Sequence, residues 1–447
     1  MTTAAGVSSR ARRGAAADRS RRAMAGREAA SRAASRAAGP RPFGNARALV
    51  CRECGAEVEL GPFYACPDCF GPLEVGYDHD RVTREDLEAG PLSIWRYASL
   101  LPVRPDIASI PNTEPGCTRL VPAANLARAL GIRSLWVKDD SGNPTHSFKD
   151  RVVAVALAAA RELGMRVLAC PSTGNLANAV AAAAARAGIE SVVLIPHDLE
   201  SAKVLTTAVY GGRLVAVRGN YDDVNRLACE IAEEERDWAF VNVNVRPYYS
   251  EGSKTLAFEV AEQLGWRLPD QVVIPVASGS QLTKVDKGFR ELASLGLVED
   301  TPYRIFGAQA AGCSPVAEAF REGRDVVRPV RPDTIVKSLA IGNPADGPYV
   351  LDVCRRTGGA VESVNDEEVR DGIELLARTE GIFAETAGGV TVATLKKLVD
   401  TGVLDPDVET VVFNTGDGLK TLDAIADRLS LEAAIEPTYA AFTAARQ

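Results

Sequence analysis

Residues 143–151 read NPTHSFKDR and place a lysine where a protonated amine is least favoured. The start of this stretch is typical of a turn, and the alanine-rich run 152–163 predicts a helix, so Lys149 falls in the first helical turn. The helix dipole is positive at that end, and partial burial also lowers the pKa of an amine. A solvated surface lysine is the ordinary alternative. A neutral amine at Lys149, however, could attack the aldehyde of a cofactor.

Pyridoxal phosphate is the aldehyde cofactor that such a lysine suggests. It needs partners for its phosphate, its ring nitrogen and its 3-hydroxyl group. Three polar stretches follow predicted strands: PSTGNLANA (171–179), ASGSQLTK (277–284) and FNTGDGLKT (413–421). Backbone N–H groups at a helix N-terminus bind anions. Each stretch alone is more often a turn or a helix cap, but their occurrence together with Lys149 favours a pyridoxal-phosphate site.

A second set of chemically active residues lies near the N-terminus. Two Cys-x-x-Cys pairs are separated by eleven residues, and a glycine follows each pair. The four thiols are those of Cys51, Cys54, Cys66 and Cys69. Pairs at this spacing are typical of a tetrahedral four-thiolate metal site. We predict a structural zinc or iron ion here; four unligated thiols are the alternative.

The elements that must position these residues alternate between short β-branched runs and alanine-rich helices. The predicted strands are 134–140, 166–172, 191–197, 213–219, 271–277, 303–310 and 409–416, and helices are predicted to begin near 149, 176, 202, 222, 282, 315 and 419. Repeated strand–helix units predict an α/β fold with a mostly parallel sheet covered by helices. Ligands of such sheets bind beyond the carboxyl ends of the strands, where the polar stretches fall.

Charge and composition divide the chain of 447 residues into three parts. Residues 1–45 hold ten arginines against two acids, about +8, so the remainder carries about −16 (−8 minus +8). We interpret 1–45 as a disordered basic tail, with a transit peptide or a mis-assigned start as alternatives. Residues 46–80 form the predicted metal ribbon, and residues 81–447 form the predicted catalytic domain.

Several classes of protein are disfavoured by the same numbers. No apolar run approaches the roughly 20 residues that span a bilayer. The net charge of −8 and the pI near 5.3 argue against binding to nucleic acid. Nine cysteines without an export signal fit a reducing compartment, so we expect a cytoplasmic protein without membrane or nucleic-acid partners.

The motifs NPTHSFKDR, STGN, the SGSQL loop and NTGDGLK, in this order, resemble the threonine synthase family of fold-type II pyridoxal-phosphate enzymes. Longer segments agree: SIWRYASLLPV (93–103), VRPYYSEGSKTLAFEVAEQLGW (245–266) and SLAIGNPADGPY (338–349). The resemblance runs from about residue 50 to about 425. It implies a tryptophan synthase β-like fold with two mostly parallel sheet subdomains. It also implies a homodimer, and some members carry the cysteine ribbon.

The resemblance also implies roles for individual residues. Lys149 would hold pyridoxal phosphate as a Schiff base and later move protons, Asn175 would bind the 3-oxygen of the cofactor, and Thr415 would face the pyridine nitrogen. The cofactor phosphate would lie against Ser278, Gly279, Ser280, Gln281 and Leu282, and the substrate carboxylate against Ser172 and Thr173.

The activity implied is the conversion of O-phosphohomoserine and water to threonine and phosphate. Expulsion of the γ-phosphate requires basic residues to stabilise the leaving group. The candidates are Arg151, Arg246 and Lys254, and we favour Lys254 because it lies in a polar motif at a helix start. A surface salt bridge is the alternative for each of them.

Two features depart from the family pattern. His146 stands where a small residue is common, and the SGSQL loop is poorer in glycine and asparagine than is usual. They keep two related chemistries open: a serine/threonine dehydratase and an O-phosphoserine β-replacement enzyme such as cysteate synthase. A metal-ribbon regulator that has lost catalysis is a further alternative, against which the intact Lys149 and Asn175 argue.

Overall fold

The computed structural model describes residues 42–79, 81–104, 114–172, 174–197, 201–219, 221–428 and 434–445. Most of the predicted tail 1–45 lies outside these ranges. Phe43 is buried, and its ring stacks on that of Tyr248 with centroids 5.1 Å apart. The packed part of the chain therefore begins slightly before residue 46.

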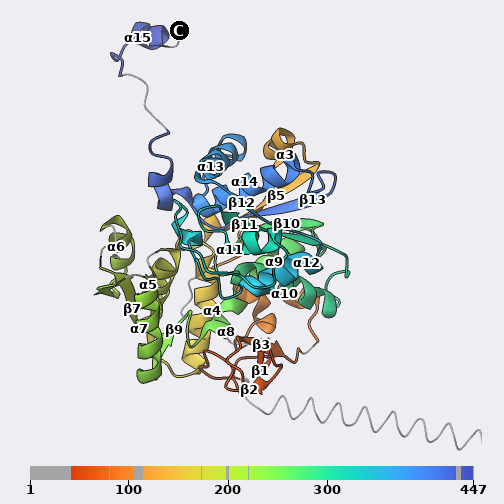
Figure 1. The fold of residues 1–447 in the computed structure, drawn as a ribbon, viewed down its shortest axis with the longest axis vertical. Helices are drawn as coiled ribbons and strands as arrows, with labels where there is room; N and C mark the ends of the chain where they lie inside the picture. Colours follow the sequence, from red (N-terminus) through yellow and green to blue (C-terminus); the bar gives the residue numbers. More distant parts are fainter. Residues whose placement is uncertain are drawn as a thin grey trace, which may run out of the picture.

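The larger of two main sheets has six strands, and it confirms the predicted mostly parallel α/β fold (Figure 1). Its order is β12 (Val361–Val364), β11 (Arg304–Ala310), β10 (Gln271–Pro275), β13 (Glu409–Asn414), β5 (Ser134–Asp139) and β4 (Arg119–Pro122). All neighbours are parallel except β4 and β5.

The strands of this sheet are apolar on both faces. Because side chains alternate along a strand, consecutive residues such as Val272 and Val273 enter opposite layers of the core. The layer with Val272 contains α9 (Lys254–Gln263), α10 (Ser280–Ser294), α11 (Pro315–Arg321) and α12 (Gly347–Arg356). The layer with Val273 contains α3 (Ala124–Leu130), α13 (Asp366–Glu380) and α14 (Thr386–Asp400).

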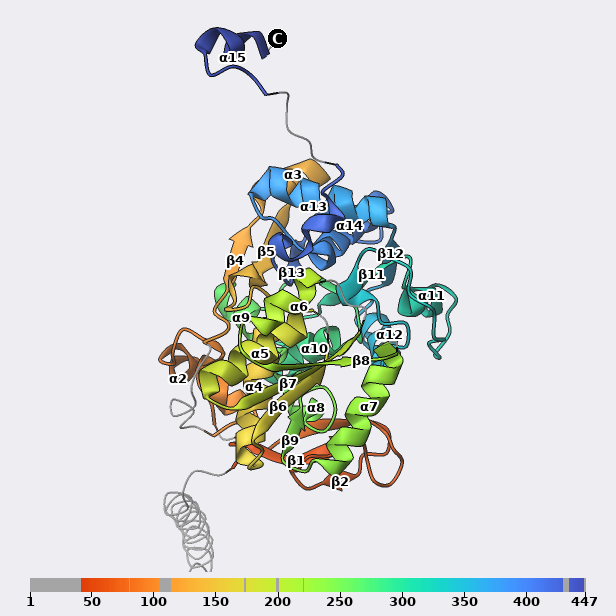
Figure 2. The same ribbon diagram turned by 90° about the vertical axis from the view of Figure 1, so that its left-hand side faces the viewer.

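The smaller sheet is fully parallel and can be followed in Figure 2. Its order is β8 (Arg213–Val217), β7 (Glu190–Pro196), β6 (Val167–Pro171) and β9 (Trp238–Phe240). One face packs on α7 (Tyr221–Glu234). The other face shares a core with α4 (Lys149–Glu162), α5 (Asn175–Ala187) and α8 (Arg246–Glu251), and α6 (Ser201–Ala208) lies beside α5.

The cysteine ribbon is a small antiparallel sheet with the order β2 (Glu57–Val58), β1 (Ala46–Cys51) and β3 (Leu73–Tyr77). It lies below α8 and α10 in Figure 1. Cys51 and Cys66 are buried in the same apolar cluster as Val152 and Val153 of α4. The ribbon therefore shares a hydrophobic core with the helix that begins at Lys149, and its strand β3 contacts α8 directly.

The remaining described elements are short. They are α2 (Arg84–Glu88), η1 (Ile94–Leu100), η3 (Asp140–Gly142), η4 (Lys337–Leu339), η5 (Gly418–Ala424) and α15 (Tyr439–Ala445). The helix predicted near residue 419 is the 3-10 helix η5, which is broken at Thr421 by non-helical backbone angles. Across the described ranges, no helix is both long and apolar enough to cross a membrane.

Candidate active site

Lys149 is the first residue of α4, as the sequence predicted. Its amine lies 4.4 Å from the ring centroid of Phe148 and 5.9 Å from that of Tyr249. Burial lowers the pKa of Lys149 to about 8, although the carboxylate of Glu385 acts in the opposite direction. A lowered pKa favours the neutral form of the amine, which suits a nucleophile.

The carboxylate of Glu385 joins the residues predicted to surround the cofactor ring. It is buried at the N-cap of α14 and accepts hydrogen bonds from Asn175 Nδ2 at 2.8 Å and Thr415 Oγ1 at 3.2 Å. Burial raises the pKa of Glu385, and the bonds from Asn175 and Thr415 oppose that rise. Sequence reasoning missed Glu385, because an acid before a helix of small residues is typical of a cap.

Backbone hydrogen bonds hold the lysine loop (residues 143–148, directly before Lys149) against the NTGDG loop (residues 414–418). Strands β5 and β13 pair in parallel, and the chain after each strand runs on to the same edge of the sheet. The N–H of Phe148 donates to Thr415 O at 2.9 Å, and that of Asp417 donates to His146 O at 3.1 Å. These bonds place Lys149 and Thr415 side by side, although they are separated by more than 260 residues.

The loop predicted to bind the cofactor phosphate lies between β10 and α10. Gly279 has a φ of +97°, a conformation that favours glycine, and α10 begins at Ser280. A Cβ atom at Gly279 would lie 2.7 Å from Val350. The Gln281 Nε2 atom is buried without a hydrogen-bond partner. The Leu282 side chain belongs to the core, so only the backbone of this residue is left to contact a phosphate.

The residues present fit pyridoxal phosphate. They supply the Lys149 amine with its lowered pKa, and the amide of Asn175 and the hydroxyl of Thr415, which both donate to Glu385. They also supply the N-terminus of α10, where the Gln281 amide has no partner. The buried Ser147 Oγ atom, two residues before Lys149, also has no partner. Buried polar groups are normally hydrogen-bonded, so these orphaned atoms are consistent with a ligand.

Comparisons with known proteins agree with this geometry. A family model described as a pyridoxal-phosphate dependent enzyme matches residues 112–416. The threonine synthase of Methanocaldococcus jannaschii is 38% identical over 84% of this chain and 93% of that protein. The threonine synthase of Methanosarcina acetivorans is 39% identical over 85% and 93%. The chain belongs to the threonine synthase family. The threonine synthase of Bacillus sp. (strain ULM1), 36% identical over 73% of this chain and 90% of that protein, extends the family to bacteria.

Solved structures of other pyridoxal-phosphate enzymes share the fold. Tomato (Solanum lycopersicum) threonine deaminase isoform 2 superposes with a TM-score of 0.58 over 69% of this chain and 82% of that one, at 20% identity. Maize serine racemase gives a TM-score of 0.57 over 70% and 93%, also at 20% identity. At this identity the structural likeness shows that the fold is shared, and the reaction must be inferred from the residues of the site.

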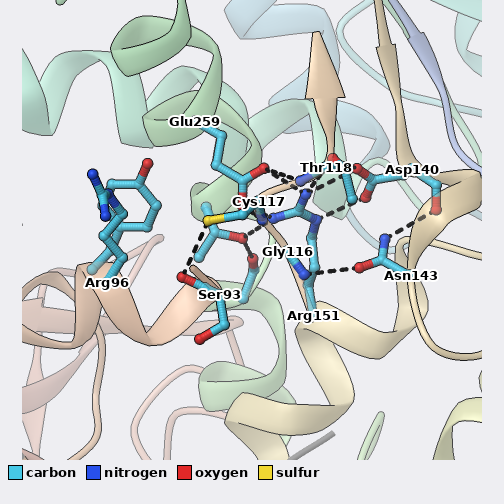
Figure 3. Close-up of polar contacts among 12 residues, drawn as sticks. Ser93, Arg96, Gly116, Cys117, Thr118, Asp140, Asn143, Arg151 and Glu259 are labelled. Atoms are coloured by element: carbon cyan, nitrogen blue, oxygen red, sulfur yellow. Dashed lines mark hydrogen bonds and ion pairs between the residues drawn. The ribbon is translucent and has the colours of Figure 1, made fainter. Parts of the chain in front are cut away.

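The structure contradicts the prediction that Arg151 binds the substrate phosphate. Its fully buried guanidinium donates to Asp140 Oδ2 at 2.7 Å and to Glu259 Oε2 at 2.8 Å (Figure 3). Glu259 also accepts from Lys138 at 2.6 Å. Arg151 is therefore an internal ion-pair residue that anchors α4 to η3 and α9.

Lys254, the favoured phosphate ligand, is also misassigned. Its amine is fully buried and lies 2.9 Å from Glu251 and 2.7 Å from Glu291, and it donates to Leu100 O at 2.8 Å. A fully buried ammonium that is paired with two carboxylates is not accessible to a substrate phosphate.

Arg246 remains the accessible candidate of the three. It opens α8, its side chain is 20% exposed, and Nη2 lies 2.6 Å from Asp346 Oδ2. It lines a small cavity together with Ser280 and Lys284. Lys420, which sequence reasoning did not single out, donates to Thr145 O at 2.6 Å beside the lysine loop.

The predicted carboxylate-binding residues are only partly described. Ser172 precedes α5, and its Oγ accepts from the N–H of Gly174 at 3.4 Å. Thr173 lies outside the described residues. His146 has a φ of +62°, which explains why a small residue is common there. Its side chain is exposed, and Nδ1 lies 3.3 Å from Ser141 O.

The four ribbon cysteines are gathered as predicted, with their sulfur atoms within 4.8 Å of one another. The Sγ atoms of Cys51 and Cys69 are 3.4 Å apart, and those of Cys54 and Cys66 are 3.8 Å apart. A Cβ atom at Gly71 would lie 2.9 Å from Cys51 Sγ, so glycine permits the close approach. Four thiolates at this separation suit a tetrahedral zinc ion.

The first prediction concerns the buried ion pairs of Arg151. Burial alone would raise the pKa of Glu259, but Arg151 and Lys138 lower it to about 2, so the carboxylate is charged. Glu259→Gln leaves buried cations uncompensated and should lower the free energy of unfolding by about 3–5 kcal/mol. Urea unfolding followed by circular dichroism measures this.

The control is Glu230→Gln, which removes an exposed ion pair with Arg226 on α7 and should cost less than about 1 kcal/mol. Equal unfolding midpoints for the two variants would contradict the assignment of Glu259 to the structural framework.

The second prediction concerns the lysine amine. Because the Glu385 carboxylate favours the protonated form of Lys149, Glu385→Gln should move the pKa of Lys149 below its value of about 8. The pH dependence of trinitrophenylation of Lys149 in cofactor-free protein, followed by peptide mapping, reports this pKa. The exposed Glu367→Gln serves as the control and should leave the profile in place. An unchanged or raised midpoint in Glu385→Gln would refute the interaction.

Proposed function

We propose that this chain converts O-phosphohomoserine and water to threonine and phosphate, with pyridoxal phosphate bound at Lys149. The observation that carries the proposal is the convergence of Lys149, Asn175 and Thr415 on Glu385. It is supported by curated threonine synthases of which the chain covers 90% or more.

The cofactor, when bound, supplies an electron sink for the charge released at the substrate α-carbon. Lys149 would hold the cofactor, and its amine, whose pKa burial lowers to about 8, would then accept and return substrate protons. Asn175 would donate to the 3-oxygen of the cofactor. Thr415 would place a neutral hydroxyl at the ring nitrogen, and such a group does not keep that nitrogen protonated.

Two anion sites are required, one for each phosphate. Residues 278–282 would receive the cofactor phosphate at the N-terminus of α10. The substrate carboxylate would lie at the start of α5, near Ser172 and Thr173. Arg246 and the newly identified Lys420 are the proposed cations for the leaving phosphate, since Arg246 shares a cavity with Ser280 and Lys420 donates to Thr145 O in the loop before Lys149.

The remaining assignments concern the whole molecule. We propose that the four cysteines hold a structural zinc ion, which their clustering supports. A homodimer is the assembly expected from the resemblance. A cytoplasmic location is supported by nine cysteines that form no disulfide and by the biosynthetic role that the relatives' names imply.

The third prediction tests the reaction itself. Cofactor-loaded protein is incubated with O-phosphohomoserine, and phosphate, threonine and 2-oxobutyrate are measured together. We expect equal amounts of phosphate and threonine, with little 2-oxobutyrate. Lys149→Ala should lower kcat by at least about 10³-fold because it removes both the attachment point and the proton carrier. Lys396→Ala, at an exposed ion pair on α14, should retain activity.

Two other outcomes of this assay would refute the proposed reaction. Release of 2-oxobutyrate with phosphate would indicate elimination without hydration and refute the synthase reaction. Failure to release phosphate would refute the substrate assignment and direct attention to O-phosphoserine and threonine.

A further inference from the structure

Arg52 lies between the first two cysteines of the ribbon, and its side chain reaches the catalytic domain. Its guanidinium carbon is 3.6 Å from the ring centroid of Tyr349, and Nη1 is 3.7 Å from Asp346 Oδ1. The neighbouring Glu53 accepts a hydrogen bond from the Tyr349 hydroxyl. A planar guanidinium can stack on an aromatic ring and pair with a carboxylate at the same time. Two consecutive ribbon residues thus hold the start of α12.

Asp346 in turn contacts the proposed cofactor-phosphate loop. Its backbone N–H donates to Ser278 O at 2.8 Å, and a Cβ atom at Gly279 would lie 3.0 Å from the Asp346 Cβ. The Asp346 carboxylate is shared between Arg52 and Arg246. Any displacement of Asp346 must therefore move both the loop backbone and Arg246.

The ribbon holds the other side of the loop as well. Glu74 on β3 forms an ion pair with Lys284, one turn into the helix that begins at Ser280. Lys284 also lies 2.7 Å from Glu251 on α8. The small cavity between the ribbon and the catalytic domain is lined by residues of both parts, among them Arg52, Glu74, Arg246, Ser280, Lys284 and Asp346.

We propose that Arg52 is a positioning residue for cofactor binding, acting through Asp346 on the Ser278–Gly279 backbone. The inference rests on the proposed function, in which residues 278–282 receive the phosphate of pyridoxal phosphate. Cys51 and Cys54 flank Arg52, and a metal ion held by these thiols would fix the backbone on both sides of it, so the ribbon would contribute to the active site as well as to the fold. A loop held in its binding conformation loses less freedom when the phosphate arrives, which favours affinity.

The fourth prediction follows from this arrangement. Full-length cofactor-free protein is titrated with pyridoxal phosphate, and the absorbance of the bound cofactor gives its Kd. Arg52→Ala should raise this Kd by about tenfold, comparable to the loss of one charged contact. The zinc content should remain equal to that of the wild type.

The matched control is Arg47→Ala, on the same ribbon but in an exposed ion pair with Glu57. It should change the Kd by less than roughly twofold, as expected for a surface pair. If Arg52→Ala loses zinc or does not fold, Arg52→Lys replaces it as the deciding variant. Lysine keeps the charge but cannot stack as a plane on Tyr349, so its Kd should still rise measurably.

The outcomes separate this inference from the proposed function. A wild-type protein that binds no pyridoxal phosphate overturns the proposed function and the inference together. Normal wild-type binding with an unchanged Kd in the deciding variant overturns the inference alone. Equal weakening by Arg47→Ala also overturns it, because the effect would then come from the ribbon as a whole.

Discussion

The buried carboxylate of Glu385 is the constraint on which the active site depends. A carboxylate that burial removes from water needs hydrogen-bond donors, and Asn175 and Thr415 provide them. Asn175 follows β6 of the smaller sheet, and Thr415 follows β13 of the larger sheet. The same charge acts on the amine of Lys149, whose pKa burial lowers to about 8. The two subdomains thus meet at a point where a weakly basic amine, an amide and a hydroxyl converge.

A second set of buried charges provides the rigid frame around this point. Arg151 lies two residues after Lys149 and is fixed by Asp140 and Glu259, so the start of α4 cannot shift without breaking buried ion pairs. Lys254 performs a comparable role where α8, α9 and α10 meet the ribbon through Glu251 and Glu291. Such pairs contribute little net stability, but removing one partner is costly, and they therefore favour one arrangement of the helices.

Much of this site could be predicted from the sequence because its motifs are local. Lys149 at a helix start and Thr415 after a strand are recognisable from neighbouring residues alone, and the four cysteines from their spacing. Arg151 and Lys254 were misassigned because some of their partners lie more than 100 residues away, up to 154 in the case of Leu100, and only the fold shows that both side chains are buried. Glu385 was missed because an acid before a helix is typical of a cap, and its partner Asn175 lies 210 residues away. Strands β9 and β12 have three and four residues and carry too short a pattern to be detected.

The proposed function requires that Lys149 be the amine that holds the cofactor. Reduction of the cofactor-loaded protein with borohydride, followed by peptide mass spectrometry, tests it most directly, because reduction fixes the pyridoxyl group on the lysine that carries it. We expect the modification on Lys149, in a single peptide and at close to one equivalent per chain. Modification of another lysine such as Lys420, or the absence of any modified peptide, would contradict it.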